Sequence, residues 1–129
     1  MQAESPGASL GRIGQIALNV KDLERGTAFY RDTLGMKLLF QFPGLSFFDA
    51  GGVRLMLSRA EDPRFDHPAS ILYYKVDDIG GTHGVLEAKG VRVEEAPHLI
   101  AQMPDHDLWI GSYKDSEDNV FALMSEVPR

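Results

Sequence analysis

An internal repeat is the feature of this sequence that most restricts its fold. The segment Val20-Lys21-Asp22-Leu23 reappears 56 residues later as Val76-Asp77-Asp78-Ile79. Further matches follow in the same order: Gly35-Met36-Lys37 with Gly90-Val91-Arg92 at a shift of 55, then Asp49 with Asp115, Leu55 with Phe121 and Leu57 with Leu123 at a shift of 66. Matches at nearly constant shifts indicate two copies of one structural unit.

The first unit predicts the element order β-α-β-β-β. Alternation of apolar and polar residues indicates the strands, and turn residues separate them. Asp22 stands where a helix N-cap belongs, and Gly35 supplies the left-handed residue that ends the helix. The predicted strands of this unit are residues 13–20, 36–42, 45–50 and 53–58.

The same order begins again after a polar, proline-containing segment. Asp78 is the expected N-cap of a helix at residues 79–89, which Gly90 ends. Strands are predicted at residues 70–76, 91–95, 108–113 and 120–124, with a long loop at residues 96–106. The chain therefore divides into a disordered tail at residues 1–11, a first module at 12–58, a linker at 59–69 and a second module at 70–126.

Composition excludes several classes of protein. The 129 residues include no cysteine, which excludes a disulfide scaffold, a thiolate metal site and a cysteine nucleophile. The net charge of −6 and the absence of a Lys/Arg cluster argue against a nucleic-acid partner. No apolar run approaches the ~18 residues of a membrane span, and residues 1–9 lack the pattern of a signal peptide. We therefore expect a cytoplasmic protein without a membrane or nucleic-acid partner.

Several motifs resemble the vicinal-oxygen-chelate superfamily, which includes glyoxalase I, bleomycin-resistance proteins and extradiol dioxygenases. They are Val20-Lys21-Asp22-Leu23, Ala28-Phe29-Tyr30, Leu34-Gly35-Met36, Val76-Asp77-Asp78-Ile79 and Tyr113-Lys114-Asp115-Ser116-Glu117-Asp118-Asn119. The last is similar to the family's F-x-D-P-x-G-N turn, with Ser116 and Asp118 in place of its proline and glycine. The resemblance covers residues 12–126. It implies an α+β, glyoxalase-like fold in which two βαβββ modules form a curled mixed sheet, the cup, and it implies a homodimer.

The strand pattern divides the side chains between the two faces of each sheet. The larger apolar residues share one parity and are expected beneath the helix. Residues of the other parity line the cup, and the candidates for contact with a ligand are Gln15, Arg54, Met56, Ile71, Tyr73 and Ala122. Arg54 either pairs with a ligand carboxylate or phosphate or is an ordinary exposed arginine, and Tyr73 either hydrogen-bonds a ligand or only fills the cup.

The resemblance also predicts that this chain lacks the family's metal site. In metal-dependent members, one ligand comes from the first and the fourth strand of each module. These positions correspond here to Gln15, Met56, Ile71 and Ala122. A divalent ion of this kind takes imidazole or carboxylate ligands, and only Gln15 offers even a neutral oxygen. We therefore expect neither a metal nor another cofactor.

The predicted loop around residues 98–107 supplies two further candidates, His106 and Trp109. Its length is typical of a functional lid. Asp105-His106-Asp107 looks like a metal-ligand cluster, but alternate residues of an extended segment point to opposite sides, which favours a solvated loop. Trp109 is either a ligand contact or part of the core or of a dimer interface.

These observations predict a metal-independent protein that binds or sequesters a small molecule. A cup without metal ligands, lined by thioether, aliphatic and phenol groups, carries this prediction. The alternative is a lyase, isomerase or dioxygenase of the same superfamily that acts on a small oxygenated metabolite, which the fold alone supports. A third interpretation is a binding or regulatory module attached to a partner protein.

Overall fold

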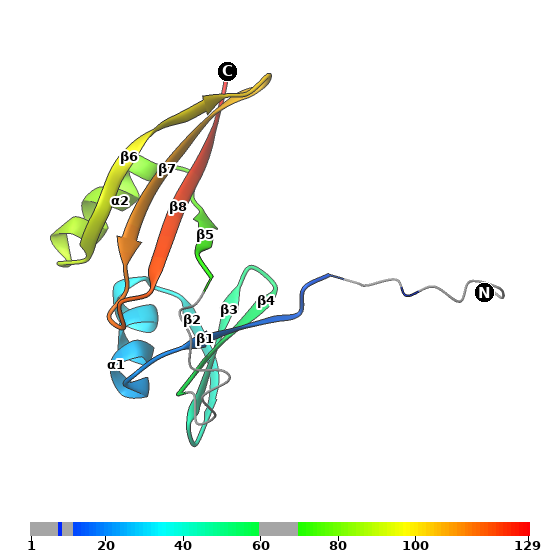
Figure 1. Cartoon of the computed structure of the whole chain (residues 1–129), viewed down its shortest axis with the longest axis vertical. Helices are drawn as coiled ribbons and strands as arrows, with labels where there is room; N and C mark the ends of the chain where they lie inside the picture. The colour runs from blue at the N-terminus through cyan, green and yellow to red at the C-terminus, as the bar shows by residue number, and fades with distance from the viewer. Residues whose placement is uncertain (1–7, 9–11, 60–69) are drawn as a thin grey trace.

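The computed structural model of the chain describes residues 8, 12–59 and 70–129 (Figure 1). The predicted tail at residues 1–11 and the predicted linker at 59–69 lie outside the described residues, apart from Ala8 and Arg59.

The first module folds as a four-stranded mixed sheet with one helical segment. Its elements are β1 (Gln15–Asn19), α1 (Leu23–Ala28), η1 (Phe29–Thr33), β2 (Lys37–Phe42), β3 (Leu45–Ala50) and β4 (Val53–Ser58). The strand order is β1-β4-β3-β2. β1 is parallel to β4, and the other two pairings are antiparallel.

The second module repeats this topology. Its elements are β5 (Leu72–Lys75), α2 (Ile79–Ala88), β6 (Arg92–Gln102), β7 (His106–Lys114) and β8 (Val120–Pro128), and the strand order is β5-β8-β7-β6. β5 and β8 are parallel, as are the corresponding first and fourth strands of the first module. The expected α+β fold of two βαβββ modules is confirmed.

Local sequence signals explain where both helices begin and end. The Asp22 carboxylate accepts the backbone N–H of Arg25, and the Asp78 carboxylate accepts that of Gly81, each at 3.0 Å, as expected of N-cap residues. Gly35 and Gly90, which follow the helical segments, have φ of +70° and +82°. A side chain disfavours this left-handed conformation, so glycine is the residue that ends each helical segment.

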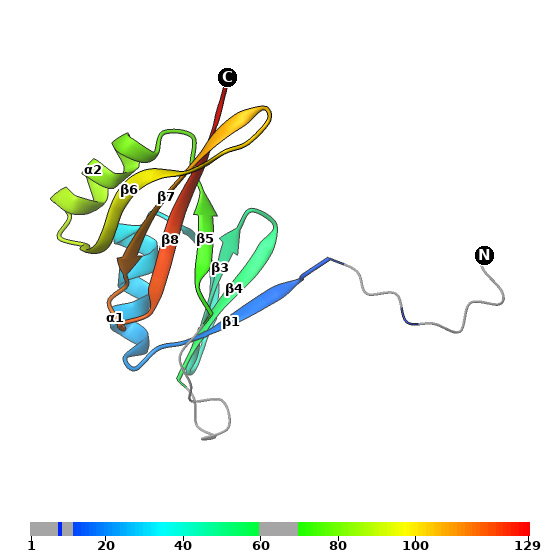
Figure 2. The same ribbon diagram turned by 45° about the horizontal axis from the view of Figure 1, so that its top comes forward.

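The predicted loop at residues 96–106 is wrong. Most of these residues belong to β6 and β7, two long antiparallel strands that extend beyond α2 (Figures 1 and 2). Pro97 made this segment look like a loop. β6 is an edge strand with irregular pairing between Glu95 and His98, and an edge strand accommodates a residue that has no N–H to donate.

The core lies between each sheet and its helix. Both helices lie on one side of the molecule, to the left in Figure 1. The predicted helix-facing residues form this core, since Leu18, Leu55, Leu57, Phe121 and Leu123 are all buried. Phe29 and Leu34 pack against the buried clusters of both modules, so the two units share one continuous apolar interior.

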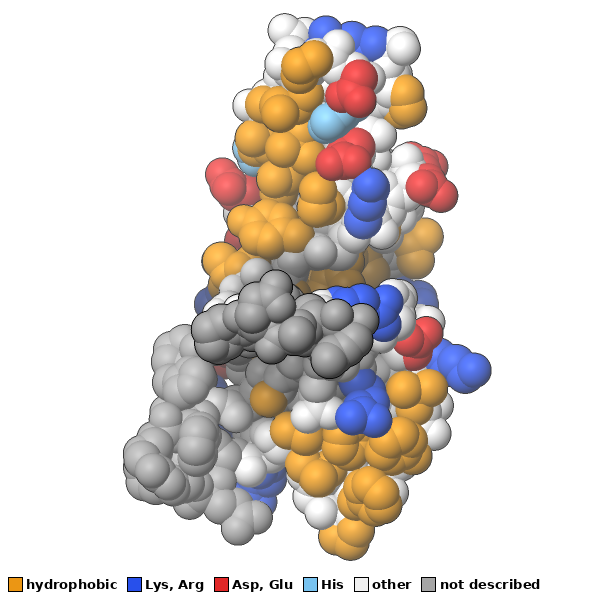
Figure 3. Space-filling model, turned by 90° about the vertical axis from the view of Figure 1, so that its right-hand side faces the viewer, with side chains coloured by type: hydrophobic (Ala, Val, Ile, Leu, Met, Phe, Trp, Pro, Cys, Tyr) orange, Lys and Arg blue, Asp and Glu red, His pale blue; other side chains and the backbone are white. Residues whose placement is uncertain are grey.

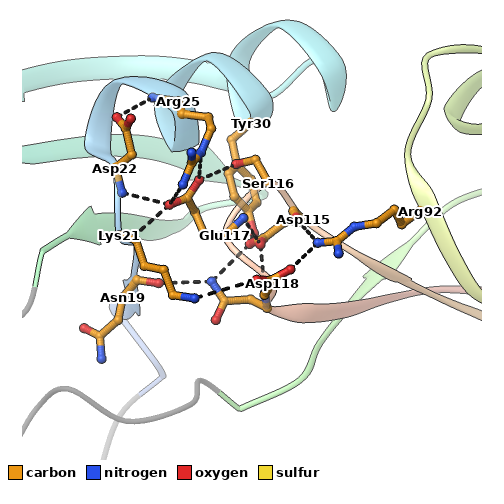
Figure 4. A network of polar contacts seen from close by, with 11 residues as sticks. Asn19, Lys21, Asp22, Arg25, Tyr30, Arg92, Asp115, Ser116, Glu117 and Asp118 are labelled. Carbon is orange, nitrogen blue, oxygen red and sulfur yellow. Dashed lines mark hydrogen bonds and ion pairs between the residues drawn. The ribbon is translucent and has the colours of Figure 1, made fainter.

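A polar network also joins the modules (Figure 4). It is centred on the turn between β7 and β8, where Asp115 and Glu117 are both buried. Tyr30 donates to Asp115 at 2.7 Å, and Arg25 donates to Glu117 at 2.7 Å. Asp118 has φ of +67°, at the position where the family turn has glycine. The turn that resembles the family motif therefore fastens the second module to the first.

Candidate functional site

The side of the molecule opposite the helices presents one face of each sheet, and we call these the open faces (Figures 1 and 3). On the first module's open face, three predicted residues contact one another. Arg54 donates from Nε to Gln15 Oε1 at 3.1 Å, and Gln15 Nε2 lies 3.7 Å from Met56 Sδ. The pairing of β1 with β4 holds Gln15 beside Arg54. The structure therefore brings Gln15, Arg54 and Met56 together as a single cluster.

Three phenylalanines continue this cluster across β2 and β3. The Phe40 and Phe47 rings stack with centroids 4.6 Å apart, and Phe42 packs edge-on against both. The Arg54 guanidinium carbon lies 5.6 Å from the centre of the Phe47 ring, within the range of a cation–π contact. Phe40 and Phe42 remain 39% and 57% exposed. This aromatic cluster is therefore available to a molecule outside the chain.

Sequence reasoning missed these phenylalanines because a β-bulge aligns them. The pairing of β2 with β3 shifts register between Leu38 and Phe40, so that Leu38 pairs with Phe48 and Phe40 pairs with Phe47. A bulge adds one residue to one strand and changes which side chains share a face. The alternation of Phe40, Phe42 and Phe47 was visible in the sequence, but the bulge that places the three rings on one face was not.

The second module's open face carries Ile71, Tyr73 and Ala122. Tyr73 pairs with Ala122 across β5 and β8. Ile71 and Tyr73 are 48% and 53% exposed, whereas Ala122 is 1% exposed. Ala122 is thus a small buried position beneath its neighbours, and Ile71 and Tyr73 are the members of this group that a ligand or a second chain can reach.

His106 lies at the start of β7, on the same open face. Its Nδ1 is 2.7 Å from Asp105 Oδ1, and its Nε2 is 3.8 Å from Glu126. Asp107 instead pairs with Arg129, so the Asp-His-Asp sequence does not converge on one point. A hydrogen bond from Lys75 lowers the pKa of Glu126, and the two form an ion pair at 2.8 Å. In Figure 3, a strip of hydrophobic side chains lies beside a group of charged ones over the upper part of the molecule.

Trp109 lies on the other face of its sheet. It has the parity of Tyr113, which is buried, and it packs partly buried against the core cluster beneath α2. The structure therefore separates Trp109 from the other predicted site residues. It lines a hollow with His83 of α2 instead.

The residues at the family's metal positions do not fit a divalent ion. The Gln15 oxygen already accepts a hydrogen bond from the cationic Arg54, and its amide nitrogen faces Met56. A positive guanidinium beside the sole oxygen donor opposes a second cation, and Ile71 and Ala122 have no donor atom. Among residues 12–59 and 70–129, no three His, Cys, Asp or Glu side chains gather in a way that could hold a metal.

Comparison with known proteins places this chain in a family. The sequence model of the Glyoxalase/Bleomycin resistance protein/Dioxygenase superfamily matches residues 12–119, and the chain therefore belongs to this superfamily. The chain is 27% identical to "Uncharacterized protein YraH" of Bacillus subtilis (strain 168), over 87% of this chain and 96% of that protein. The resemblance seen in the sequence motifs is confirmed.

Solved structures share the fold at lower identity. The antibiotic-binding protein TnmS3 from Streptomyces sp. CB03234 is 23% identical, with a TM-score of 0.73, over 93% of this chain and 99% of that one. Lactoylglutathione lyase from Agrobacterium tumefaciens is 24% identical, with a TM-score of 0.67, over 94% and 96% of the two chains. Binding proteins and enzymes therefore share this architecture. The fold does not distinguish the two functions, so the function has to be inferred from the side chains of the open faces.

Among the described residues, no helix is long and apolar enough to cross a membrane.

Proposed function

We propose that this protein binds a small molecule on its open faces without the help of a metal. The observation that carries the proposal is the cluster of Phe40, Phe42 and Phe47 beside Arg54 and Gln15. It lies on the sheet that carries two of the four positions, Gln15 and Met56, at which the resemblance places the metal ligands, and it offers an aromatic surface, one fixed cation and one amide.

This set of groups suits an aromatic ligand that carries an anionic group. Planar rings gain about 0.5–1.5 kcal/mol per aromatic pair beyond the burial of their area. A guanidinium is the side chain best shaped to bind a carboxylate, a sulfonate or a phosphate. The amide, guanidinium, thioether and phenyl groups of this cluster are not the usual nucleophiles, general acids or general bases, which supports binding or sequestration over catalysis.

A homodimer is the second part of the proposal. Each chain leaves apolar side chains exposed on both open faces, with Phe40 and Phe42 on one and Ile71 and Tyr73 on the other. Exposed apolar groups of this size are typical of surfaces that meet a partner or a ligand. A second copy can place its second module opposite the first module, which would enclose the ligand between two sheets.

Titration with 1-anilinonaphthalene-8-sulfonate tests the binding site, because this fluorescent probe combines aromatic rings with a sulfonate. We expect saturable binding that is unchanged by EDTA and at least tenfold weaker in Arg54→Gln and in Phe40→Leu. Arg31→Gln is the matched control, since Arg31 pairs with Asp32 on the helical segment η1. Equal affinities for the Arg54 and Arg31 variants would refute the proposed site.

A further inference from the structure

The hollow lined by Trp109 and His83 lies on the helix side of the second sheet, away from the open faces. Its volume is about 450 Å³, and its lining includes Gly80 and His83 of α2, Pro97 of β6, Trp109 of β7 and Val127 of β8. Apart from His83 its walls are almost entirely apolar. Pockets that hold small molecules have similar volumes, with mostly apolar walls and a few polar groups.

The shape of the second module produces this hollow. α2 has 10 residues and is about 15 Å long, whereas β6 has 11 residues and extends to about 36 Å. The helix therefore covers only part of the sheet. Gly80 lines the hollow and has no side chain to fill it, and a Cβ added at Gly111 would lie 3.1 Å from the Pro97 backbone nitrogen. The close approach at Gly111 lets β6 bend inward and form one wall.

His83 is the polar group of the hollow, and its ring has a fixed orientation. Its Nδ1 is hydrogen-bonded to the Tyr113 hydroxyl at 2.9 Å. Burial raises the pKa of Tyr113, so this hydroxyl remains protonated at neutral pH. The other ring nitrogen, Nε2, lies 3.6 Å from Glu87 Oε1, beyond hydrogen-bond distance. Nε2 thus has Glu87 within ion-pair distance but no hydrogen bond, and it is the ring nitrogen that Tyr113 leaves to a molecule in the hollow.

The charged groups next to the hollow are predominantly acidic. Glu87 lies one turn after His83, and Asp78 caps the same helix. Asp107, two residues before Trp109, is paired with Arg129 at 2.8 Å. Acidic surroundings repel an anion and tolerate a neutral or cationic molecule. The face of an indole ring further attracts a cation.

We propose that this hollow binds a small planar aromatic molecule that carries no negative charge. The ring packs between Trp109 and Pro97, and a hydroxyl or amino group bonds to His83 Nε2. The site lies on the helix side of the second sheet, whereas the proposed anion-binding cluster lies on the open face of the first sheet, so either assignment can fail while the other holds.

Trp109 provides a direct test, because it is the only tryptophan of the chain and its indole N–H gives a single NMR signal. Phenol, benzylamine and benzoate are titrated separately into the ¹⁵N-labelled protein. We expect saturable shifts of the Trp109 signal with phenol and benzylamine, and at least tenfold weaker binding of benzoate. An absence of saturable shifts, or equal affinity for benzoate, would overturn the proposal.

Variants distinguish binding in the hollow from non-specific binding to the protein surface. Val127 is 41% exposed, and Val127→Phe is expected to fill the hollow and weaken phenol binding at least fivefold without unfolding the chain. Val85→Phe makes the same change at a residue of α2 that is 52% exposed and does not line the hollow, and we expect no effect. His83→Gln should weaken phenol binding less than Val127→Phe does.

Equal affinities in the two phenylalanine variants would contradict the site. A Trp109 signal that moves with protein concentration and not with the probes would assign the hollow to an interface between copies, which also overturns the proposal.

Discussion

At the scale of single residues, Glu117 holds the two modules together. Its side chain has no exposed surface, although it carries a charge. Its carboxylate accepts the backbone N–H groups of Lys21 and Asp22 at 2.9 and 2.8 Å and the Arg25 side chain at 2.7 Å (Figure 4). A residue of the second module thus satisfies the donors at the start of the first module's helix. The family motif explains the turn, but only the structure shows this partner.

Replacement of Glu117 by glutamine tests this role. The variant loses the charge that faces Arg25 and presents an N–H group where donors already converge. We expect a loss of about 2 kcal/mol in the free energy of unfolding, measured by urea denaturation. Asp32→Asn is the control, because Asp32 pairs with Arg31 at 61% side-chain exposure, and such surface pairs contribute less than about 1 kcal/mol. Similar losses in both variants would contradict the role.

The interactions of the Glu117 carboxylate should also affect how the free energy of unfolding depends on pH. Burial alone would raise the pKa of Glu117, but hydrogen bonds from Arg25, Asp22, Ser116 and Lys21 outweigh it and lower the pKa to about 2. Because the folded pKa lies below the unfolded one, this stabilisation is complete above the unfolded pKa of about 4.3 and is lost as the pH falls toward 2. Urea titrations between pH 6 and 2.5 should show a smaller decrease in Glu117→Gln than in the native protein.

At the scale of elements, residue pattern predicted the caps and most strands, and it failed where pairing is irregular. Asp22, Gly35, Asp78 and Gly90 are local signals, so they could be recognised one at a time. The long strands β6 and β7 could not, because Pro97 is compatible with a strand only at an edge, and edge position depends on the whole sheet. The bulge in β2 is hidden for the same reason: it depends on the partner strand.

Two glycines of α2 should respond in opposite ways to substitution by alanine. Gly84 has no atom within 4 Å of an added Cβ, and an alanine inside a helix is favoured by about 0.5–1 kcal/mol over glycine. At Gly81, an added Cβ would collide with the carboxylate of the N-cap residue Asp78. We expect Gly84→Ala to raise the melting temperature and Gly81→Ala to lower it, as measured by circular dichroism. The reverse order would contradict the cap geometry.

At the scale of the whole molecule, the repeat predicted the architecture but not its assembly. Two modules with one strand order follow from matched motifs, because each module is a local unit of about 50 residues. Whether the two open faces meet within one chain or across two depends on how complete chains associate, and no local motif encodes that. The exposed apolar groups on both faces are the structural feature that bears on the question.

The proposed homodimer gives the last prediction. Sedimentation should show a species of about 29 kDa, twice the 14.3 kDa chain, at micromolar concentration. Tyr73→Glu places a charge on an open face at a residue 53% exposed in the single chain, and burial of that charge between copies is costly. We expect its dimer dissociation constant to rise at least tenfold. Val85→Glu, at 52% exposure on the helix side, should leave the constant unchanged. If both variants dimerise equally well, or if the native chain sediments at about 14 kDa, the open faces are not the dimer interface.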